Sequence, residues 1–225
     1  MNLDGLRRVF FGSDSYALVF VLFLAAMVFA IAAPGNRGVW LVSNVIYLVA
    51  AAAALWTSAS TPAPLRARVL IPLGLLTLAA IGVAAAVDST GTAAALGSLL
   101  IAFIGVVIVY DLVTQGAATW QAALGVLTLY VLLGIQFGSL YSVIAAFEGG
   151  SFFANETEGT LSDHLYFSFT TLTTTGYGDF AAASGIGRAL AALEMVSGEL
   201  FLVTVVAVAV TRITRVRVER ALEQR

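Results

Sequence analysis

Apolar stretches about as long as a bilayer is thick recur along this 225-residue chain. A helix needs about 20 mostly apolar residues to cross the hydrocarbon core of a membrane. Hydrophobic residues make up 60% of the sequence and charged residues only 11%, whereas soluble domains carry about 25% charged residues. We therefore predict an all-α integral membrane protein with six transmembrane helices, at residues 15–33, 39–56, 69–87, 93–113, 120–144 and 190–210.

The arginines predict the orientation of these helices, because cytoplasmic loops carry an excess of basic residues. With six spans, most arginines fall on one side of the membrane, and only Arg37 and Arg188 fall on the other. We therefore expect a protein of the cell membrane with both termini in the cytoplasm. The arginines on the cytoplasmic side are Arg7, Arg8, Arg66, Arg68, Arg212, Arg215, Arg217, Arg220 and Arg225.

The first apolar stretch has a second interpretation. Arg7 and Arg8, the apolar run and the Ala-Ile-Ala-Ala sequence at 30–33 resemble a secretory signal peptide with its cleavage site. The run is about 19 residues long, whereas the apolar part of a signal peptide has about 7–15, so we favour a retained helix. Cleavage would leave the topology of the rest unchanged.

The segment between the fifth and sixth stretches, residues 145–189, is far longer than the other connections. Within it, residues 161–173 have the pattern of a short helix, which Ser162 or Asp163 can cap. This helix is too short to cross a bilayer, so we predict that it enters the membrane from outside as a re-entrant segment. Non-helical backbone at membrane depth is tolerated only where protein surrounds it or water lines it.

The motif Thr-Thr-Thr-Gly-Tyr-Gly-Asp, residues 173–179, follows this short helix. Backbone carbonyls can replace the water around a cation if they all point toward one axis. An extended strand directs successive residues to opposite sides, so a one-sided row needs conformations that residues with a Cβ resist. Gly176 and Gly178 provide glycine at alternate positions. The motif therefore predicts a cation-binding row of carbonyls.

Residues 176–181 also fit a turn, or the G-x-G-x-x-A fingerprint of a nucleotide-binding fold. That fingerprint requires a soluble strand–turn–helix unit with an acidic partner further along the chain. Apolar stretches flank the motif on both sides, so we favour the cation-binding interpretation.

Residues 166–179, followed by Gly187-Arg188 and Gly198, resemble the pore module of the potassium channel family. The resemblance extends over about residues 141–211, and it is greatest to small prokaryotic members with six helices, one pore loop and no large cytosolic domain. The first four predicted helices carry no specific resemblance. The predicted spans and the pore module together divide the chain into three parts. These are a four-helix N-terminal membrane region without an arginine-rich voltage sensor (1–116), a pore domain (117–212) and a short cytoplasmic tail (213–225).

The resemblance also implies the ion-binding residues. Backbone carbonyls of the selectivity filter would bind K⁺, and the Thr174 hydroxyl would form the innermost site. Asp179 would attract cations at the outer mouth. The filter residues are Thr174, Thr175, Gly176, Tyr177 and Gly178.

By the same resemblance, other residues would support the filter or move with the gate. Tyr177 would point away from the ion and pack against Tyr166 and Phe167. Thr170 stands where some relatives have a glutamate that pairs with the aspartate. Gly198 matches an inner-helix glycine that acts as a gating hinge.

The chain departs from the family pattern at a few positions. Thr175 stands where valine or isoleucine is common, and Ala182 and its neighbours replace the proline that usually follows the aspartate. These departures bear on inactivation more than on selectivity. Sodium-permeable relatives typically lose the tyrosine, and Tyr177 is present.

One pore loop cannot enclose an axis, so we predict a homotetramer with closed cyclic symmetry. We expect membrane lipids as partners, with anionic lipid at the C-terminal arginines as one possibility, and K⁺ as the permeant ion. We expect no cofactor, no metal other than K⁺ and no nucleic-acid partner. The sequence contains no cysteine, which excludes disulfides and thiolate metal sites. It shows no catalytic set, so we predict that the chain is not an enzyme.

Two acids lie inside the sixth apolar stretch, where charge is costly. Glu194 and Glu199 are about 140° apart around a helix of 3.6 residues per turn, so they cannot share one environment. We expect Glu199 to line an inner cavity with Leu202 and Val206, or else to be a protonated or hydrogen-bonded packing residue. We expect Glu194 to be a buried acid behind the filter, bonded to the pore helix, or else to contact a neighbouring span.

Further predictions concern regulation. Residues 93–113 contain no arginine, so we predict weak or no intrinsic voltage dependence. His164, at the start of the short helix, is expected to be a capping or solvated residue rather than a pH sensor. The sequence thus favours passive conduction of potassium. The alternatives are a less selective cation channel, a secondary potassium transporter subunit, or a non-conducting membrane sensor.

Overall fold

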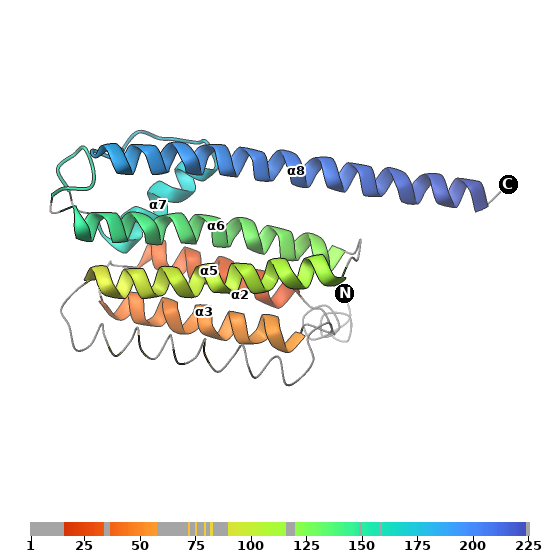
Figure 1. Ribbon diagram of the computed structural model, residues 1–225, viewed down its shortest axis with the longest axis horizontal. Helices are drawn as coiled ribbons and strands as arrows, with labels where there is room; N and C mark the ends of the chain where they lie inside the picture. The colour runs from red at the N-terminus through yellow and green to blue at the C-terminus, as the bar shows by residue number, and fades with distance from the viewer. Residues whose placement is uncertain are drawn as a thin grey trace.

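The computed structural model describes residues 16–33, 37–57, 90–115, 120–148, 150–157 and 159–223, and also Pro72, Leu75, Ala79 and Gly82. The described residues form six named helices and no β-strand, which confirms the all-helical prediction for this part of the chain. The helices are α2 (Tyr16–Ala32), α3 (Arg37–Thr57), α5 (Thr90–Gln115), α6 (Trp120–Phe147), α7 (Leu161–Leu172) and α8 (Gly185–Glu223), shown in Figure 1.

The predicted spans correspond to α2, α3, α5, α6 and the first part of α8, with ends that differ by a few residues except in α8, which is longer. The predicted span at 69–87 lies mostly outside the described residues, as do Arg7, Arg8, Arg66 and Arg68. Among the described residues, only Ala122–Phe147 is long and apolar enough to cross a membrane by length and composition, with a mean hydropathy of 1.8. Tyr16–Ala32 and Ala94–Tyr110 are shorter apolar helices. The count of six spans stays a prediction.

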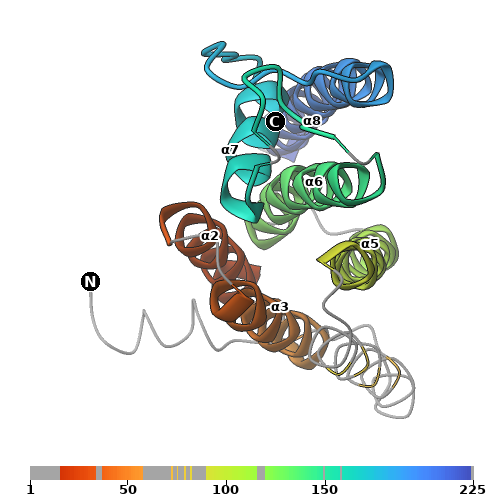
Figure 2. The same ribbon diagram turned by 90° about the vertical axis from the view of Figure 1, so that its left-hand side faces the viewer.

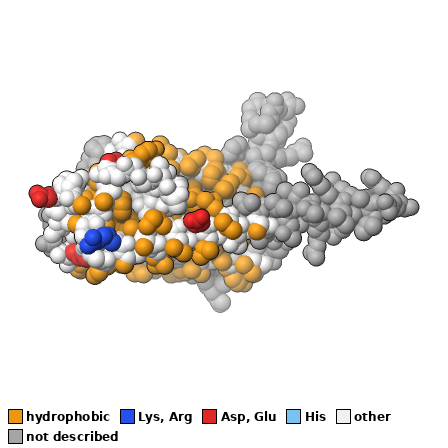
Figure 3. Space-filling view, turned by 90° about the horizontal axis from the view of Figure 1, so that it is seen from above, with side chains coloured by type: hydrophobic (Ala, Val, Ile, Leu, Met, Phe, Trp, Pro, Cys, Tyr) orange, Lys and Arg blue, Asp and Glu red, His pale blue; other side chains and the backbone are white. Residues whose placement is uncertain are grey.

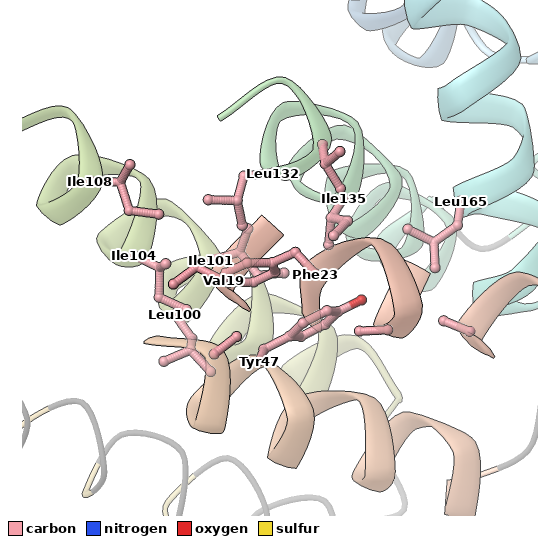
Figure 4. Close-up of a cluster of buried hydrophobic side chains, with 14 of the residues drawn as sticks. Val19, Phe23, Tyr47, Leu100, Ile101, Ile104, Ile108, Leu132, Ile135 and Leu165 are labelled. Carbon is pink, nitrogen blue, oxygen red and sulfur yellow. The ribbon is translucent and has the colours of Figure 1, made fainter. Parts of the chain in front are cut away.

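Two of the N-terminal helices, α2 and α5, pack against α6, and α3 packs against α2 and, less extensively, against α5. A short connection joins α5 to α6, so these two helices run antiparallel and in contact, and α2 contacts both α3 and α6 (Figure 1). In a membrane, close van der Waals packing of apolar side chains and hydrogen bonds between helices hold such helices together. Figure 4 shows the shared core. Its labelled residues are Val19, Phe23, Tyr47, Leu100, Ile101, Ile104, Ile108, Leu132, Ile135 and Leu165.

The short helix α7 lies between α2 and α8 and against α6 (Figure 2). Two glycines of α6 allow the close approach of α7. A Cβ on Gly134 would lie 2.6 Å from the ring of Phe169, and one on Gly138 would lie 2.7 Å from the side chain of Leu165. The Gly-x-x-x-Gly spacing on α6 therefore brings two helices together, as such small-residue pairs do in membranes.

At its N-terminal end α7 contacts α2, the first helix among the described residues. The hydroxyl of Ser162 donates a hydrogen bond of 2.5 Å to the carbonyl oxygen of Ile31, near the end of α2. The N-terminal helix α2 is thus attached directly to α7, which precedes the candidate site.

The last helix, α8, runs past the end of the other helices (Figure 1). Its first half contacts α7 and α6. Figure 3 shows that the face of the molecule on the α8 side is largely hydrophobic, with isolated charged side chains. Leu193, Val196, Leu200 and Val203 of α8 are exposed in the single chain. A row of exposed apolar side chains on one helix is typical of a surface that faces lipid or another subunit.

Candidate functional site

The start of α7 is fixed by a capping box. Thr160 is the N-cap, and its side chain accepts a hydrogen bond from the backbone N–H of Asp163. In return, the backbone N–H of Thr160 donates to a carboxylate oxygen of Asp163 over 2.7 Å. The prediction that Ser162 or Asp163 is the cap was therefore wrong by two or three positions. Asp163 contributes as the third helical residue, and its charge suits the positive end of the helix dipole.

Aromatic residues of the preceding loop support α7 from the side. Phe152 and Phe153 are buried, and the loop pairs with the segment after the filter motif at an isolated bridge between Phe153 and Ala182. Both rings contact the imidazole of His164, at centroid distances of 5.0 and 5.2 Å. The prediction of a capping or solvated histidine was therefore wrong. His164 is only 2% exposed and lies 3.1 Å from the hydroxyl of Ser142 on α6.

The chain reverses direction at the end of α7 through hydrogen bonds to helix carbonyls. The N–H groups of Thr175 and Gly176 both donate to the carbonyl oxygen of Thr170, over 2.9 and 3.0 Å. The N–H of Thr174 donates to Thr171 over 3.0 Å. These bonds occupy carbonyls that the helix end leaves free, and they fix the position of the motif relative to α7. Thr170, which the sequence placed among the filter supports, acts here through its backbone.

The motif has an alternating backbone. Thr174, Gly176 and Gly178 have positive φ angles of 56°, 49° and 82°, whereas Thr175 and Tyr177 between them do not. When left- and right-handed residues alternate, successive peptide groups turn the same way, so their N–H groups gather on one side and their carbonyls on the other. Such a strand can present a row of oxygens to one partner. Glycine adopts this conformation at no steric cost, while Thr174 adopts it with strain.

Residues 173–179 are exposed in the single chain. No described part of the chain covers the motif, and Tyr177 is 72% exposed. Its ring stacks on Tyr166 at a centroid distance of 6.4 Å and an interplanar angle of 7°. Phe167 does not share this stack, because it is buried against Phe152, Phe153 and Tyr141.

The outer end of the motif is tied to α7 by Asp179. A hydrogen bond to the Asp179 carboxylate raises the pKa of Tyr166 above its ordinary value, since the bond favours the protonated phenol. Tyr166 therefore contacts two residues of the motif, Tyr177 by stacking and Asp179 by hydrogen bonding.

The inner helix α8 lies against the deep end of α7. A Cβ on Gly198 would overlap the carbonyl oxygen of Leu172 and would lie 2.9 Å from its side chain. This glycine lets α8 touch the residue at which α7 ends. The hinge role that the resemblance assigns to Gly198 stays a prediction.

The two acids of α8 lie in different environments, as their spacing predicts. Glu194 is fully buried and bonded to Tyr141 and Ser168, whereas Glu199 is exposed in the single chain. Leu202 is also exposed, and the side chain of Val206 is outside the described residues. A shared cavity of Glu199, Leu202 and Val206 would need more than one subunit.

Sequence reasoning missed Tyr141 and Ser168 as functional candidates. Both are ordinary residues of apolar helices, and no spacing links them to Glu194, which is 53 positions from one and 26 from the other. The only signal was Glu194 itself, because a buried acid in a membrane helix needs polar partners.

Residues 125–215 match the ion channel family model. The chain therefore carries an ion channel domain, which extends from Gly125 in α6 through α7 to Arg215 in α8. An ion channel domain implies a membrane protein, in agreement with the apolar composition. Comparison with curated proteins gives no match.

Proposed function

We propose that the protein is a potassium-selective channel that conducts K⁺ passively down its electrochemical gradient. The observation that carries this proposal is the alternation of positive φ angles at Thr174, Gly176 and Gly178 inside the ion channel domain. A row of backbone oxygens on one side of a strand is the arrangement that replaces the hydration shell of K⁺.

The proposed filter residues are Thr174, Thr175, Gly176, Tyr177 and Gly178, with Asp179 at the outer mouth. The stack of Tyr177 on Tyr166 would hold the filter at its width. The C-terminal end of α7 carries partial negative charge from the helix dipole. In the assembly this end would stabilise a cation below the filter.

The active form in this proposal is a homotetramer. One filter strand offers oxygens from one side only, so a ring around an ion requires four copies related by a closed symmetry. The exposure of the whole motif and of the apolar face of α8 in the single chain supports such an assembly.

The proposal includes weak or no voltage dependence. A voltage sensor needs several charges that cross the membrane field. The helix α5 carries no arginine; its one charged residue is Asp111. Both termini would lie in the cytoplasm of the cell, where the arginines of the tail could bind anionic lipid.

Flux measurements on the purified full chain in liposomes would test the proposal. We expect K⁺ efflux down a gradient, little or no Na⁺ flux under the same gradient, and block by Ba²⁺. Equal fluxes of both ions would indicate a less selective cation channel. Flux that requires a second, coupled ion would indicate a transporter subunit, and the absence of any flux would indicate a non-conducting protein.

A further inference from the structure

Three helices converge on the carboxyl group of Glu194, which is 0% exposed. The hydroxyl of Tyr141 on α6 lies 2.6 Å from Oε2, and the hydroxyl of Ser168 on α7 lies 2.5 Å from Oε1. Ser168 has a second oxygen neighbour, the backbone carbonyl of Gly134 on α6, at 2.7 Å. One side chain of α8 is thus joined to both helices that surround it.

The number of protons in this network fixes the state of Glu194. An oxygen–oxygen separation of 2.7 Å or less requires a proton between the two atoms. The carbonyl of Gly134 can only accept, so the single hydroxyl proton of Ser168 belongs to that bond. The bond between Ser168 and Oε1 then needs another proton, and only the carboxyl group can provide it. Tyr141 donates its own proton to Oε2.

The burial of Glu194 independently indicates that its carboxyl group is protonated. A carboxylate without a nearby cation is costly in an apolar interior, whereas a neutral acid with two hydrogen bonds is not. Among the residues that the structure describes, the titratable groups that face Glu194 are Tyr141 and Tyr130 of α6, and α7 faces it with Ser168. None of these side chains carries a positive charge.

We propose that Glu194 is a neutral carboxylic acid whose proton positions α7, and with it the filter, against α6 and α8. The proposal rests on the proposed function for its effect on conduction, but the state of the acid is independent of that function. Glu194 does not touch the permeant ion, and it acts on the filter through α7. Ser168 lies two residues before Thr170, whose carbonyl oxygen holds Thr175 and Gly176.

Because the hydrogen bond between Glu194 and Ser168 depends on the carboxyl proton, deprotonation of Glu194 would weaken this contact. When Glu194 loses its proton, the carboxylate competes with the carbonyl of Gly134 for the single proton of Ser168, so one of the two bonds is lost. The position of α7 then becomes less well defined. Alkaline pH is therefore expected to lower K⁺ flux, by about fivefold if one hydrogen bond is lost in the coupling of α7 to the filter.

The variant Glu194→Gln tests the state of the acid. Glutamine reproduces both bonds, because its N–H₂ group donates to Ser168 and its oxygen accepts from Tyr141, but it has no proton to lose. We expect K⁺ flux close to that of the wild type at neutral pH and no fall in flux between neutral pH and about pH 10, where ordinary tyrosines ionise. A variant that assembles but has lost its flux at neutral pH would overturn the proposal. Glu199→Gln, on the same helix, is the matched control and is expected to keep the alkaline fall.

Infrared spectroscopy of the full chain in liposomes provides a readout that does not depend on conduction. We expect the wild type to show a protonated carboxyl band at neutral pH that Glu194→Gln lacks and Glu199→Gln retains. Tyr141→Phe removes only one hydroxyl group, so it should shift this band without abolishing it. Identical carboxyl bands in the wild type and Glu194→Gln, or a band that Tyr141→Phe leaves unshifted, would overturn the proposal even if the protein conducts K⁺. A wild type that shows the band but does not conduct would refute the proposed function alone.

Discussion

Gly198 of α8 lies directly against the carbonyl oxygen of Leu172, the last residue of α7. The hydroxyl of Tyr130 on α6 donates a hydrogen bond of 3.3 Å to the same oxygen. The end of α7 is therefore held between α6 and α8, immediately before the residues that turn into the filter motif.

We predict that Gly198→Ala displaces the end of α7, because the added Cβ would overlap a backbone atom that cannot rotate away. Overpacking of this kind costs about 1–3 kcal/mol. The expected result is a lower thermal stability of the assembly together with a lower K⁺ flux. Gly185→Ala is the matched control, since a Cβ at position 185 meets nothing within 4 Å. If Gly198→Ala kept the thermal stability of the wild type but changed the open times of single channels, the result would instead support the hinge role of Gly198.

A second prediction concerns the glycines of the filter motif. A residue with a Cβ pays about 1–2 kcal/mol in the left-handed region, so Gly178→Ala would strain the strand in every subunit of a tetramer. We expect K⁺ flux in liposomes to fall by more than about tenfold, with the assembly intact by size-exclusion chromatography. The same substitution at Gly185, which does not have a positive φ, should leave the flux unchanged. Full flux in Gly178→Ala would show that the backbone alternation is not needed for conduction.

The contact between α6 and α7 yields a third prediction. Gly134→Ala places a Cβ against the ring of Phe169, and we expect a loss of stability of about 1–3 kcal/mol. Phe169→Leu removes most of the ring, so the double variant should recover part of that loss, as measured by thermal unfolding in detergent. Gly105→Ala on α5 meets nothing within 4 Å and is the control. If the two effects simply added, the sites would not be in contact.

Glu199 gives a prediction for the cavity. Exposed in the single chain, this acid would attract cations into a shared inner cavity if four copies of α8 surround it. Glu199→Gln should then lower single-channel conductance and weaken block by cations from the inner side. Leu202→Ala changes the same region without removing a charge and is the comparison. If Glu199→Gln changed neither the single-channel conductance nor the block by inner cations, Glu199 would not attract cations into the cavity.

The capping box at the start of α7 can be tested separately. Thr160→Ala removes the side chain that accepts from the N–H of Asp163, and loss of an N-cap typically costs about 1 kcal/mol. We expect a lower midpoint of thermal unfolding with K⁺ selectivity unchanged, because the cap lies at the end of α7 that is far from the filter. Glu148→Gln, at an exposed position after α6, should have no effect. A change in selectivity from Thr160→Ala would contradict this separation.

Much of the fold follows from simple periodic and length rules. Runs of about 20 apolar residues give helices because the backbone must satisfy its own hydrogen bonds in lipid, and α2, α5 and α6 follow such runs closely. Gly134 and Gly138 of α6 have the small-residue spacing that permits a close helix partner, but the spacing does not show that this partner is α7. Which helices meet depends on tertiary contacts such as the bond from Ser162 to Ile31, 131 positions apart, and no local pattern encodes these.

The candidate site was predictable where local chemistry alone sets the conformation. Glycine at positions 176 and 178 pointed to positive φ angles, and both residues have them. The positive φ of Thr174 was not predictable, because threonine resists this conformation. The burial of His164 was missed for a different reason. Its environment is made by Phe152 and Phe153, which reach it from a loop with no helical periodicity.

The central claim is that backbone oxygens of the filter motif select K⁺, and the most direct test is the reversal potential of the purified protein in a planar bilayer with K⁺ on one side and Na⁺ on the other. The account predicts a large reversal potential with the sign of a K⁺-selective current, and its loss in Gly178→Ala but not in Gly185→Ala. A reversal potential near zero for the wild type would contradict it.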